Sequence, residues 1–157
     1  MDPAEQRLTQ LGFKLPAAPA PVGGYRSANL LDGLIYTSGQ LSWEAGKIRY
    51  AGRLGKEVTV EQGRAAAVLA TLNLLAQLKN VCGGELRRIT GCARISCHLA
   101  CTDSFTDHPS VIEPISDIIL AVFGPENGAH ARLAYGSPAL PFDSPIEVEG
   151  IFRLGPA

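Results

Sequence analysis

The chain has 157 residues, and its 14 Lys and Arg against 15 Asp and Glu leave a formal net charge of −1. Hydrophobic residues make up 46% and charged residues 18% of the sequence, which excludes the disordered, collagen-like and disulfide-rich classes. The balanced charge argues against nucleic acid as a partner, because domains that bind it usually have a pI above about 9.

Length and hydropathy indicate one domain over residues 1–157. No apolar run approaches the roughly 18–20 residues of a membrane span, so we expect no membrane partner. The first ten residues lack the basic-then-apolar order of a signal peptide, and we expect a soluble, cytoplasmic protein.

Residues 1–20 predict a short helix and an irregular lead-in. Asp2 suits the N-cap, Pro3 the first helical turn, and Glu5 has the spacing of a capping box. Lys14–Pro21 is rich in Pro and Ala, and each Pro restricts the preceding residue to extended conformations. We interpret this segment as a strap over the domain.

A β-hairpin follows the lead-in. Tyr25–Leu31 and Leu34–Leu41 are β-prone and are separated by Asp32 and Gly33, a pair typical of a type I′ turn. Ile48–Tyr50 predicts a short third strand.

Two long amphipathic helices are predicted. Thr59 and Gln62 form a capping box before a helix that runs to about Val81. A second helix ends at Gly124, and Pro114 leaves its start uncertain by a turn. Each helix has an apolar stripe at helical spacing: Ala65, Val68, Leu69, Leu72, Leu75 and Ala76 in the first, and Val111, Ile112, Ile115, Ile118, Ile119, Val122 and Phe123 in the second.

Three further strands are predicted, over Ile89–Cys101, His130–Ser137 and Ile146–Leu154. The first alternates between an apolar face (Ile89, Ala93, Ile95, Cys97, Leu99 and Cys101) and a mixed face (Thr90, Cys92, Arg94, Ser96 and His98). The element order predicts an α+β fold with one mixed sheet and two helices packed on one face.

The other sheet face has no partner within the chain. We expect it to mix apolar side chains with Ser38, Arg94, His98, Arg132 and Glu147. Water covers such a face only in part, so we expect a homo-oligomer that brings sheets together.

The four cysteines are expected to be buried free thiols. No two of them have the CxxC spacing that is usual in zinc sites. Cys97 and Cys101 would lie about 13 Å apart along one face of a strand, which is too far for a disulfide or a shared metal. Burial is the usual state of such cysteines.

Arg132 and Glu147 are the candidate functional pair. We expect both to face the uncovered side of the sheet, where a charge is costly unless it is paired or used. The planar fork of Arg suits a carboxylate, and Glu can order or activate a water. From the residues alone, two interpretations remain: Arg132 and Glu147 form a ligand site, or they form a structural ion pair between adjacent strands.

Other catalytic signatures are missing. The Gly-rich segments match neither phosphate-binding pattern, and Ser38 lies outside a G-x-S-x-G elbow. We interpret His98, His108 and His130 as structural or solvent-facing rather than as ribonuclease acid–base groups.

A series of motifs in chain order resembles the RidA/YjgF family, whose members are called reactive-intermediate imine deaminases or L-PSP-type endoribonucleases. The resemblance covers roughly residues 15–154. It is carried by Pro21-Val22-Gly23-Gly24-Tyr25, Tyr36-Thr37-Ser38-Gly39-Gln40, Ala66 with Leu72-Asn73-Leu74, Asp103-Ser104-Phe105, His130-Ala131-Arg132, Leu140-Pro141 and Ile146-Glu147-Val148-Glu149.

The resemblance implies a chorismate-mutase-like subunit and a homotrimer whose sheets meet around a central barrel, with ligand clefts between subunits. It implies hydrolysis of 2-imino or enamine acids to 2-oxo acids and ammonia, with no metal and no cofactor. By the same resemblance Arg132 holds the substrate carboxylate and Glu147 orders the attacking water. The resemblance also implies that Tyr25 and Ser38 line the cleft, that Gln40 lies close by and that Glu113 stands near it, and we expect these four residues to bind the ligand.

The chain is longer than compact members of the family by its N-terminal helix and extra loop residues, so it resembles a longer branch, and two departures suggest a pocket for a different ligand. Ala134 stands where many members have Cys, and Glu113 where Asn is often found. The alternatives are a non-catalytic trimer that binds small carboxylates and an L-PSP-type endoribonuclease or translation inhibitor. The aromatic content of 6% argues against the ribonuclease, since single-stranded RNA sites usually stack bases on aromatic rings.

Overall fold

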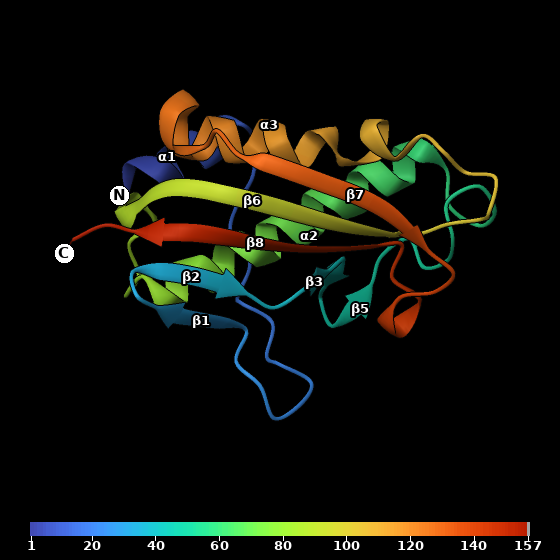
Figure 1. The fold of residues 1–157 in the computed structure, drawn as a ribbon, viewed down its shortest axis with the longest axis horizontal. Helices are drawn as coiled ribbons and strands as arrows, with labels where there is room; N and C mark the ends of the chain where they lie inside the picture. Colours follow the sequence, from blue (N-terminus) through green and yellow to red (C-terminus); the bar gives the residue numbers. More distant parts are fainter. Residues whose placement is uncertain (157) are drawn as a thin grey trace.

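A mixed β-sheet with two long helices on one face forms the body of the computed structural model, which describes residues 1–156 (Figure 1). Ala157, the last residue of the predicted domain, lies outside the described residues. The sheet consists of β1 (Ala28–Leu31), β2 (Leu34–Thr37), β3 (Gln40–Leu41), β6 (Ile89–Ala100), β7 (Ala131–Ser137) and β8 (Ile146–Leu154). The predicted α+β fold is confirmed.

The strand order is β1-β2-β8-β6-β7, and β3 also pairs with β8. Only β6 and β7 run parallel; the other pairs in this sheet are antiparallel. The last strand in sequence therefore lies in the middle of the sheet, and β7 lies at its edge. As a result, β7 and β8 are not neighbours, because β6 separates them.

The hairpin turn has the predicted geometry. Asp32 and Gly33 both have positive φ, 50° and 77°, which a type I′ turn requires. The strands are shorter than predicted: β1 starts at Ala28, and the second strand is interrupted between β2 and β3. The predicted third strand over Ile48–Tyr50 is observed as β5 (Lys47–Ile48), which pairs with β4 (Trp43–Glu44). It does not extend to Tyr50, because the φ of 59° at Tyr50 is outside the extended region.

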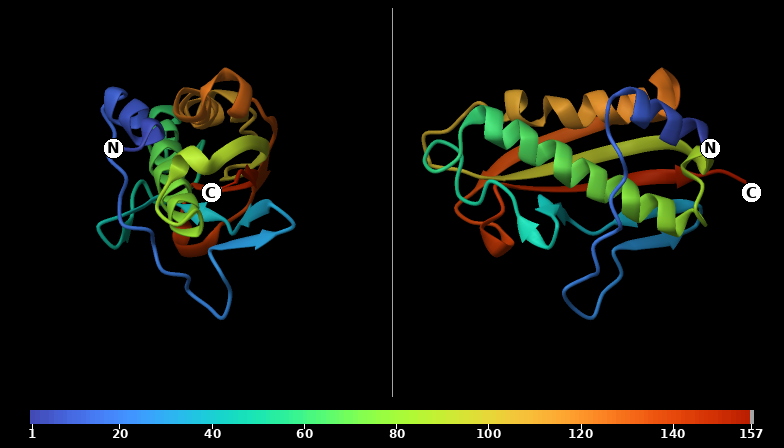
Figure 2. Two further views of the ribbon diagram at one scale, coloured as in Figure 1. Left: turned by 90° about the vertical axis from the view of Figure 1, so that its left-hand side faces the viewer. Right: turned by 180° about the vertical axis from the view of Figure 1, so that it is seen from behind.

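The two long helices, α2 (Val60–Val81) and α3 (His108–Asn127), lie side by side along one face of the sheet (Figure 2). The capping box of α2 is present: the Gln62 amide donates to Thr59 Oγ1 at 3.2 Å, and the Thr59 amide to Gln62 Oε1 at 3.0 Å. The kink of α3 falls at Gly124, whose φ of 86° is not helical, and a last turn follows to Asn127.

The short helix α1 (Pro3–Gln10) begins at the predicted N-cap, with Asp2 Oδ1 accepting from the Ala4 amide at 2.8 Å, but Glu5 does not complete the predicted capping box. Glu5 pairs with Lys79 of α2 at 2.9 Å. After α1 the lead-in crosses α2 (Figure 2, right), and Gln77 Nε2 donates to the Pro19 carbonyl at 2.6 Å. The predicted strap is therefore observed.

Two register shifts in β6 change the faces predicted for this strand. They fall between Ile89 and Gly91 and between Cys92 and Arg94. Cys92 is consequently buried, at 5% exposed, and Ala93 is exposed, which is the reverse of the prediction. An extra residue at a bulge shifts the alternation by one position, and a strict period of two cannot anticipate it.

Candidate functional site

Glu147, the second residue of β8, lies on the uncovered sheet face as predicted. It pairs with His98 of β6, while its neighbour Val148 points to the core and is fully buried. Glu147 lines a cavity of about 90 Å³ together with Tyr25, Gln40 and Phe142. Gly39 lies directly against its side chain: a Cβ on Gly39 would stand 2.6 Å from Glu147 Cγ.

The surroundings of Glu147 raise the pKa of its carboxyl group above the usual range, mainly because burial disfavours the charged form. His98 lowers this pKa and Glu149 raises it, both by a smaller amount. A raised pKa makes a carboxylate a better proton acceptor near neutral pH. Glu147 therefore holds its proton to a higher pH than an exposed carboxyl group does.

The predicted ligand residues near Glu147 differ in their availability. Tyr25 is 51% exposed at the mouth of the cavity. Gln40 is buried, and its amide donates to the Ser38 carbonyl at 3.3 Å and accepts from Gln77 Nε2 at 3.5 Å. The Ser38 hydroxyl donates to the Arg26 carbonyl at 2.6 Å and does not line the cavity, so it holds the loop before β1 in place.

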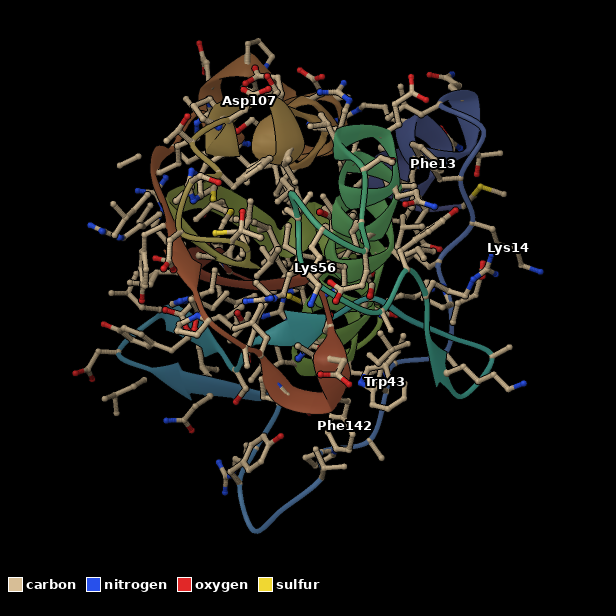
Figure 3. All side chains as sticks on the ribbon, turned by 90° about the vertical axis from the view of Figure 1, so that its right-hand side faces the viewer. Phe13, Lys14, Trp43, Lys56, Asp107 and Phe142 are labelled. Carbon is tan, nitrogen blue, oxygen red and sulfur yellow. The ribbon has the colours of Figure 1, made fainter. Side chains whose placement is uncertain are left out.

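The end of the cavity is closed by an aromatic pair. The rings of Trp43 and Phe142 lie 5.2 Å apart (Figure 3), and Phe142 has a positive φ of 57° in the turn before β8. A larger hollow of about 410 Å³ lies beside Trp43, between the lead-in and α2, and contains none of the predicted site residues.

Arg132 lies on the helix-covered face, so the prediction that it shares a face with Glu147 is wrong. In the parallel ladder it stands opposite Ile95, and directly paired residues point to the same side of a sheet. Ile95 is 1% exposed in the core. Because β7 is an edge strand, Arg132 can point toward α3 and still reach solvent around the edge, where 32% of its side chain is exposed.

Two residues of α3 hold one end of the Arg132 side chain, and His130 in turn holds one of them. Its Nη1 donates to Glu113 Oε2 at 2.9 Å and to Ser116 Oγ at 3.1 Å, both on α3. Ser116 Oγ lies 2.9 Å from His130 Nε2, and His130 Nδ1 lies 2.6 Å from the Gly128 carbonyl. Since a carbonyl only accepts, His130 Nδ1 carries a proton and donates it to Gly128, and the tautomer protonated at Nδ1 alone leaves Nε2 to accept from the Ser116 hydroxyl.

The opposite edge of the guanidinium is available. Both hydrogens of Nη1 are used by Glu113 and Ser116, while Nε and Nη2 of Arg132 have no hydrogen bond within residues 1–156. Nε and Nη2 form a planar fork that matches the two oxygens of a carboxylate. The arrangement can therefore bind a carboxylate without breaking the contacts that hold Arg132.

The predicted residues thus form two clusters rather than one. Tyr25, Gln40 and Glu147 line one cavity, although Gln40 pairs with the buried Val148 and its side chain points toward α2. Arg132 and Glu113 lie at the edge of the sheet beside α3. An ion pair between Arg132 and Glu147 on adjacent strands, the alternative from sequence, is also wrong, because β6 lies between them.

Sequence reasoning missed Gly39 and Ser116. Gly39 belongs to the Ser-Gly-Gln signature, but only the fold shows that its missing side chain makes room for Glu147. Ser116 gives no signal in an apolar helix. His130 has the structural role predicted for it, and its hydrogen bond to Ser116 links it to Arg132.

The four cysteines are free and buried, as predicted. Burial raises the pKa of Cys82 to about 11 and that of Cys92 and Cys97 to about 12, so these thiols stay protonated. Within residues 1–156, no three His, Cys, Asp or Glu side chains are grouped to hold a metal ion, and none of the helices is both long and apolar enough to cross a membrane.

Residues 5–152 match the family described as "YjgF/chorismate mutase-like, putative endoribonuclease". Protein TCP17 of Trypanosoma cruzi is 37% identical over 147 residues, which are 94% of this chain and 91% of that protein. A 2-iminobutanoate/2-iminopropanoate deaminase of Rattus norvegicus is 30% identical over 144 residues, 88% of this chain and 86% of the deaminase.

Among solved structures, a "putative endoribonuclease" of Shewanella oneidensis superimposes with a TM-score of 0.92 at 38% identity, over 98% of this chain and all of the other. The family match spans nearly the whole chain, and the fold of the Shewanella protein agrees over 98% of it. The chain therefore belongs to the YjgF/chorismate mutase-like family, as its motifs indicate.

Proposed function

We propose that this protein hydrolyses reactive 2-imino and enamine acids to 2-oxo acids and ammonia, in clefts completed between the copies of a homotrimer. The observation that carries this proposal is the free Nε–Nη2 edge of Arg132, whose other end is held by Glu113 and Ser116. Such a fork binds a carboxylate bidentately and fixes the neighbouring C2 atom in one position.

Glu147 supplies the second part of the reaction. Its carboxylate takes a proton from a water, whose oxygen attacks C2 of the imine while the C=N π electrons move to nitrogen. Glu147 passes that proton to the nitrogen, which gives a carbinolamine. The C–N bond then breaks as the hydroxyl proton is transferred to the nitrogen, so that a 2-oxo acid and ammonia leave, one water is consumed for each ammonia, and Glu147 is again ionised. The raised pKa of Glu147 suits this proton transfer. Imines already hydrolyse in water, so the site needs only to orient and polarise them.

The separation of Arg132 and Glu147 supports a site between copies. Within one chain they occupy different faces of the sheet, with β6 between their strands. The uncovered face also carries partly exposed apolar side chains that a second copy would cover: Tyr36, Leu133 and Tyr135. A neighbouring copy that packs on this face can bring its own Arg132 toward Glu147.

Kinship supports the chemistry, because a related protein bears the name 2-iminobutanoate/2-iminopropanoate deaminase. The buried free cysteines agree with a reducing compartment, and we place the reaction in the cytoplasm.

The direct test is ammonia release from freshly generated 2-iminobutanoate, with the oligomeric state measured by light scattering. Arg132→Ala and Glu147→Gln are each expected to lose activity. Co-expression of the two variants should restore roughly a quarter of the wild-type rate, because random mixing of subunits gives that share of interfaces with both residues intact. No recovery in mixed oligomers would contradict a site shared between copies.

Parallel incubations separate the alternatives. Binding of 2-oxobutanoate without ammonia release would indicate a carboxylate-binding trimer, which the Arg132 fork alone would explain. Cleavage of single-stranded RNA that survives Arg132→Ala would indicate an endoribonuclease.

A further inference from the structure

We propose that Glu113 makes this site selective for ligands with a positively charged nitrogen next to the carboxylate, that is, 2-iminium and 2-ammonium acids rather than 2-oxo or 2-hydroxy acids. The proposal rests on the proposed function, because it takes Arg132 as the carboxylate-binding group. It identifies the charge state of the substrate and the residue that selects it.

The geometry places an acidic group directly beside the carboxylate fork. Glu113 Oε2 accepts from Arg132 Nη1 at 2.9 Å, and 49% of the Glu113 side chain is exposed. Its second oxygen, Oε1, has no hydrogen-bond partner within residues 1–156. A ligand carboxylate on Nε and Nη2 would therefore share one guanidinium with the Glu113 carboxylate.

Two carboxylates on one guanidinium carry two negative charges against one positive charge. An acid without a compensating cation is repelled by Glu113, because like charges a few ångströms apart at a partly exposed site are unfavourable. An iminium or ammonium nitrogen on C2 removes this cost, since it is bonded to the atom next to the ligand carboxylate and can donate to Glu113 Oε1.

This selection also favours the reactive form of the substrate. Water attacks C2 of a protonated imine more readily than C2 of a neutral one, because nitrogen then accepts the electron pair without developing a negative charge. A carboxylate beside that nitrogen stabilises the protonated form. Glu113 thus helps to bind the iminium, while Glu147 of the neighbouring copy acts on the water.

The test compares ligands of equal shape that differ in the group at C2. L-2-aminobutanoate and L-2-hydroxybutanoate share the carboxylate and the carbon chain, and both are stable enough for titration calorimetry. We expect the wild-type protein to bind the amino acid about tenfold more tightly. Glu113→Gln should reduce this ratio to near one, because it should lower the affinity for the amino acid and raise the affinity for the hydroxy acid.

Glu126→Gln is the matched control, because it removes the same charge from the exposed last turn of α3, where Glu126 has no ion pair within residues 1–156. It should leave the ratio unchanged, and melting temperatures verify that both variants fold. The proposed role of Glu113 would be overturned if Glu113→Gln had the same affinity ratio as the wild type. It would also be overturned if the wild-type protein preferred the hydroxy acid.

Arg132→Ala separates this inference from the proposed function. It should abolish binding of both ligands whatever Glu113 does. If it leaves both affinities intact, or if neither ligand binds the wild-type protein, the carboxylate site itself is wrong. If Arg132→Ala abolishes binding while Glu113→Gln changes the affinities for both ligands equally, only the role of Glu113 is wrong.

Discussion

Arg132 and Glu147 point to opposite faces of one sheet, and the whole width of β6 separates their strands. The cavity that Glu147 lines does not include Arg132 of the same chain. Their separation is instead what a ligand cleft between subunits requires, since each copy then contributes one half of the site.

The fork of Arg132, rather than its charge alone, should decide carboxylate affinity. Arg132→Lys keeps the charge but loses the Nε–Nη2 edge, and we expect 2-oxobutanoate affinity to fall at least tenfold. Arg132→Ala should cost about 2–5 kcal/mol in binding. The melting temperature should change little, because a half-exposed ion pair such as Arg132–Glu113 contributes at most about 1 kcal/mol. Full affinity in the Lys variant would contradict bidentate binding.

Ser116 should act as a positioning residue for Arg132. Its hydroxyl accepts from Arg132 Nη1 and donates to His130 Nε2. Ser116→Ala removes both bonds, and we expect carboxylate affinity to fall about three- to tenfold, the value of one hydrogen bond. Ser116→Thr keeps the hydroxyl and should retain most of the affinity. Equal losses in both variants, at equal melting temperatures, would indicate a packing role only.

The sequence predicts local structure well where a few neighbouring residues determine it. Thr59 with Gln62 and Asp32 with Gly33 are such cases, because the hydrogen bonds or backbone angles involve residues at most three positions apart. The bulges that bury Cys92 depend on how β6 pairs with β8, more than fifty residues away in sequence, and no local pattern encodes them.

The site was predictable by residue type but not by arrangement. Family motifs point to Arg132 and Glu147, yet the face of Arg132 depends on β7 pairing with β6 in parallel at the sheet edge. Alternation within His130–Ser137 is too weak to assign that face, because apolar and polar residues occur on both sides. Sequence also cannot show that Glu113 and Ser116, one turn apart on α3, both reach the same nitrogen.

Glu147 should make stability depend on pH. Burial raises its pKa above the ordinary value of 4.5, so the folded protein holds this proton to higher pH than the unfolded chain does. Ionisation therefore destabilises the fold as the pH rises above about 4.5. In urea titrations, Glu147→Gln should be more stable than the wild type at pH 7 and lose this advantage at pH 4. An advantage that is equal at both pH values would show that the effect is not ionisation.

The thiols should be unreactive in the folded protein. Cys82, Cys92 and Cys97 are at least 95% buried with raised pKa values, while Cys101 lies next to a surface hollow, 3.7 Å from His108 Nε2. With a disulfide reagent at pH 8 we expect Cys101 to react first and slowly, and all four thiols to react at once in denaturant. If the slow phase of the reaction is absent in Cys101→Ser, that phase is assigned to Cys101.

Gly39 should be required for activity more than for stability. A Cβ at this position would collide with the carboxyl group and Cγ of Glu147, and the flexible end of that side chain can move away. We therefore expect Gly39→Ala to lower the unfolding free energy by less than about 1 kcal/mol, because no rigid core atom is displaced. Ammonia release should nevertheless fall at least tenfold, because the proposed general base, Glu147, is displaced from its position. Gly24→Ala, at a position with no atom within 4 Å, is the matched control and should retain the wild-type rate. An active Gly39→Ala protein would mean that the position of Glu147 against Gly39 is not the one used in the reaction.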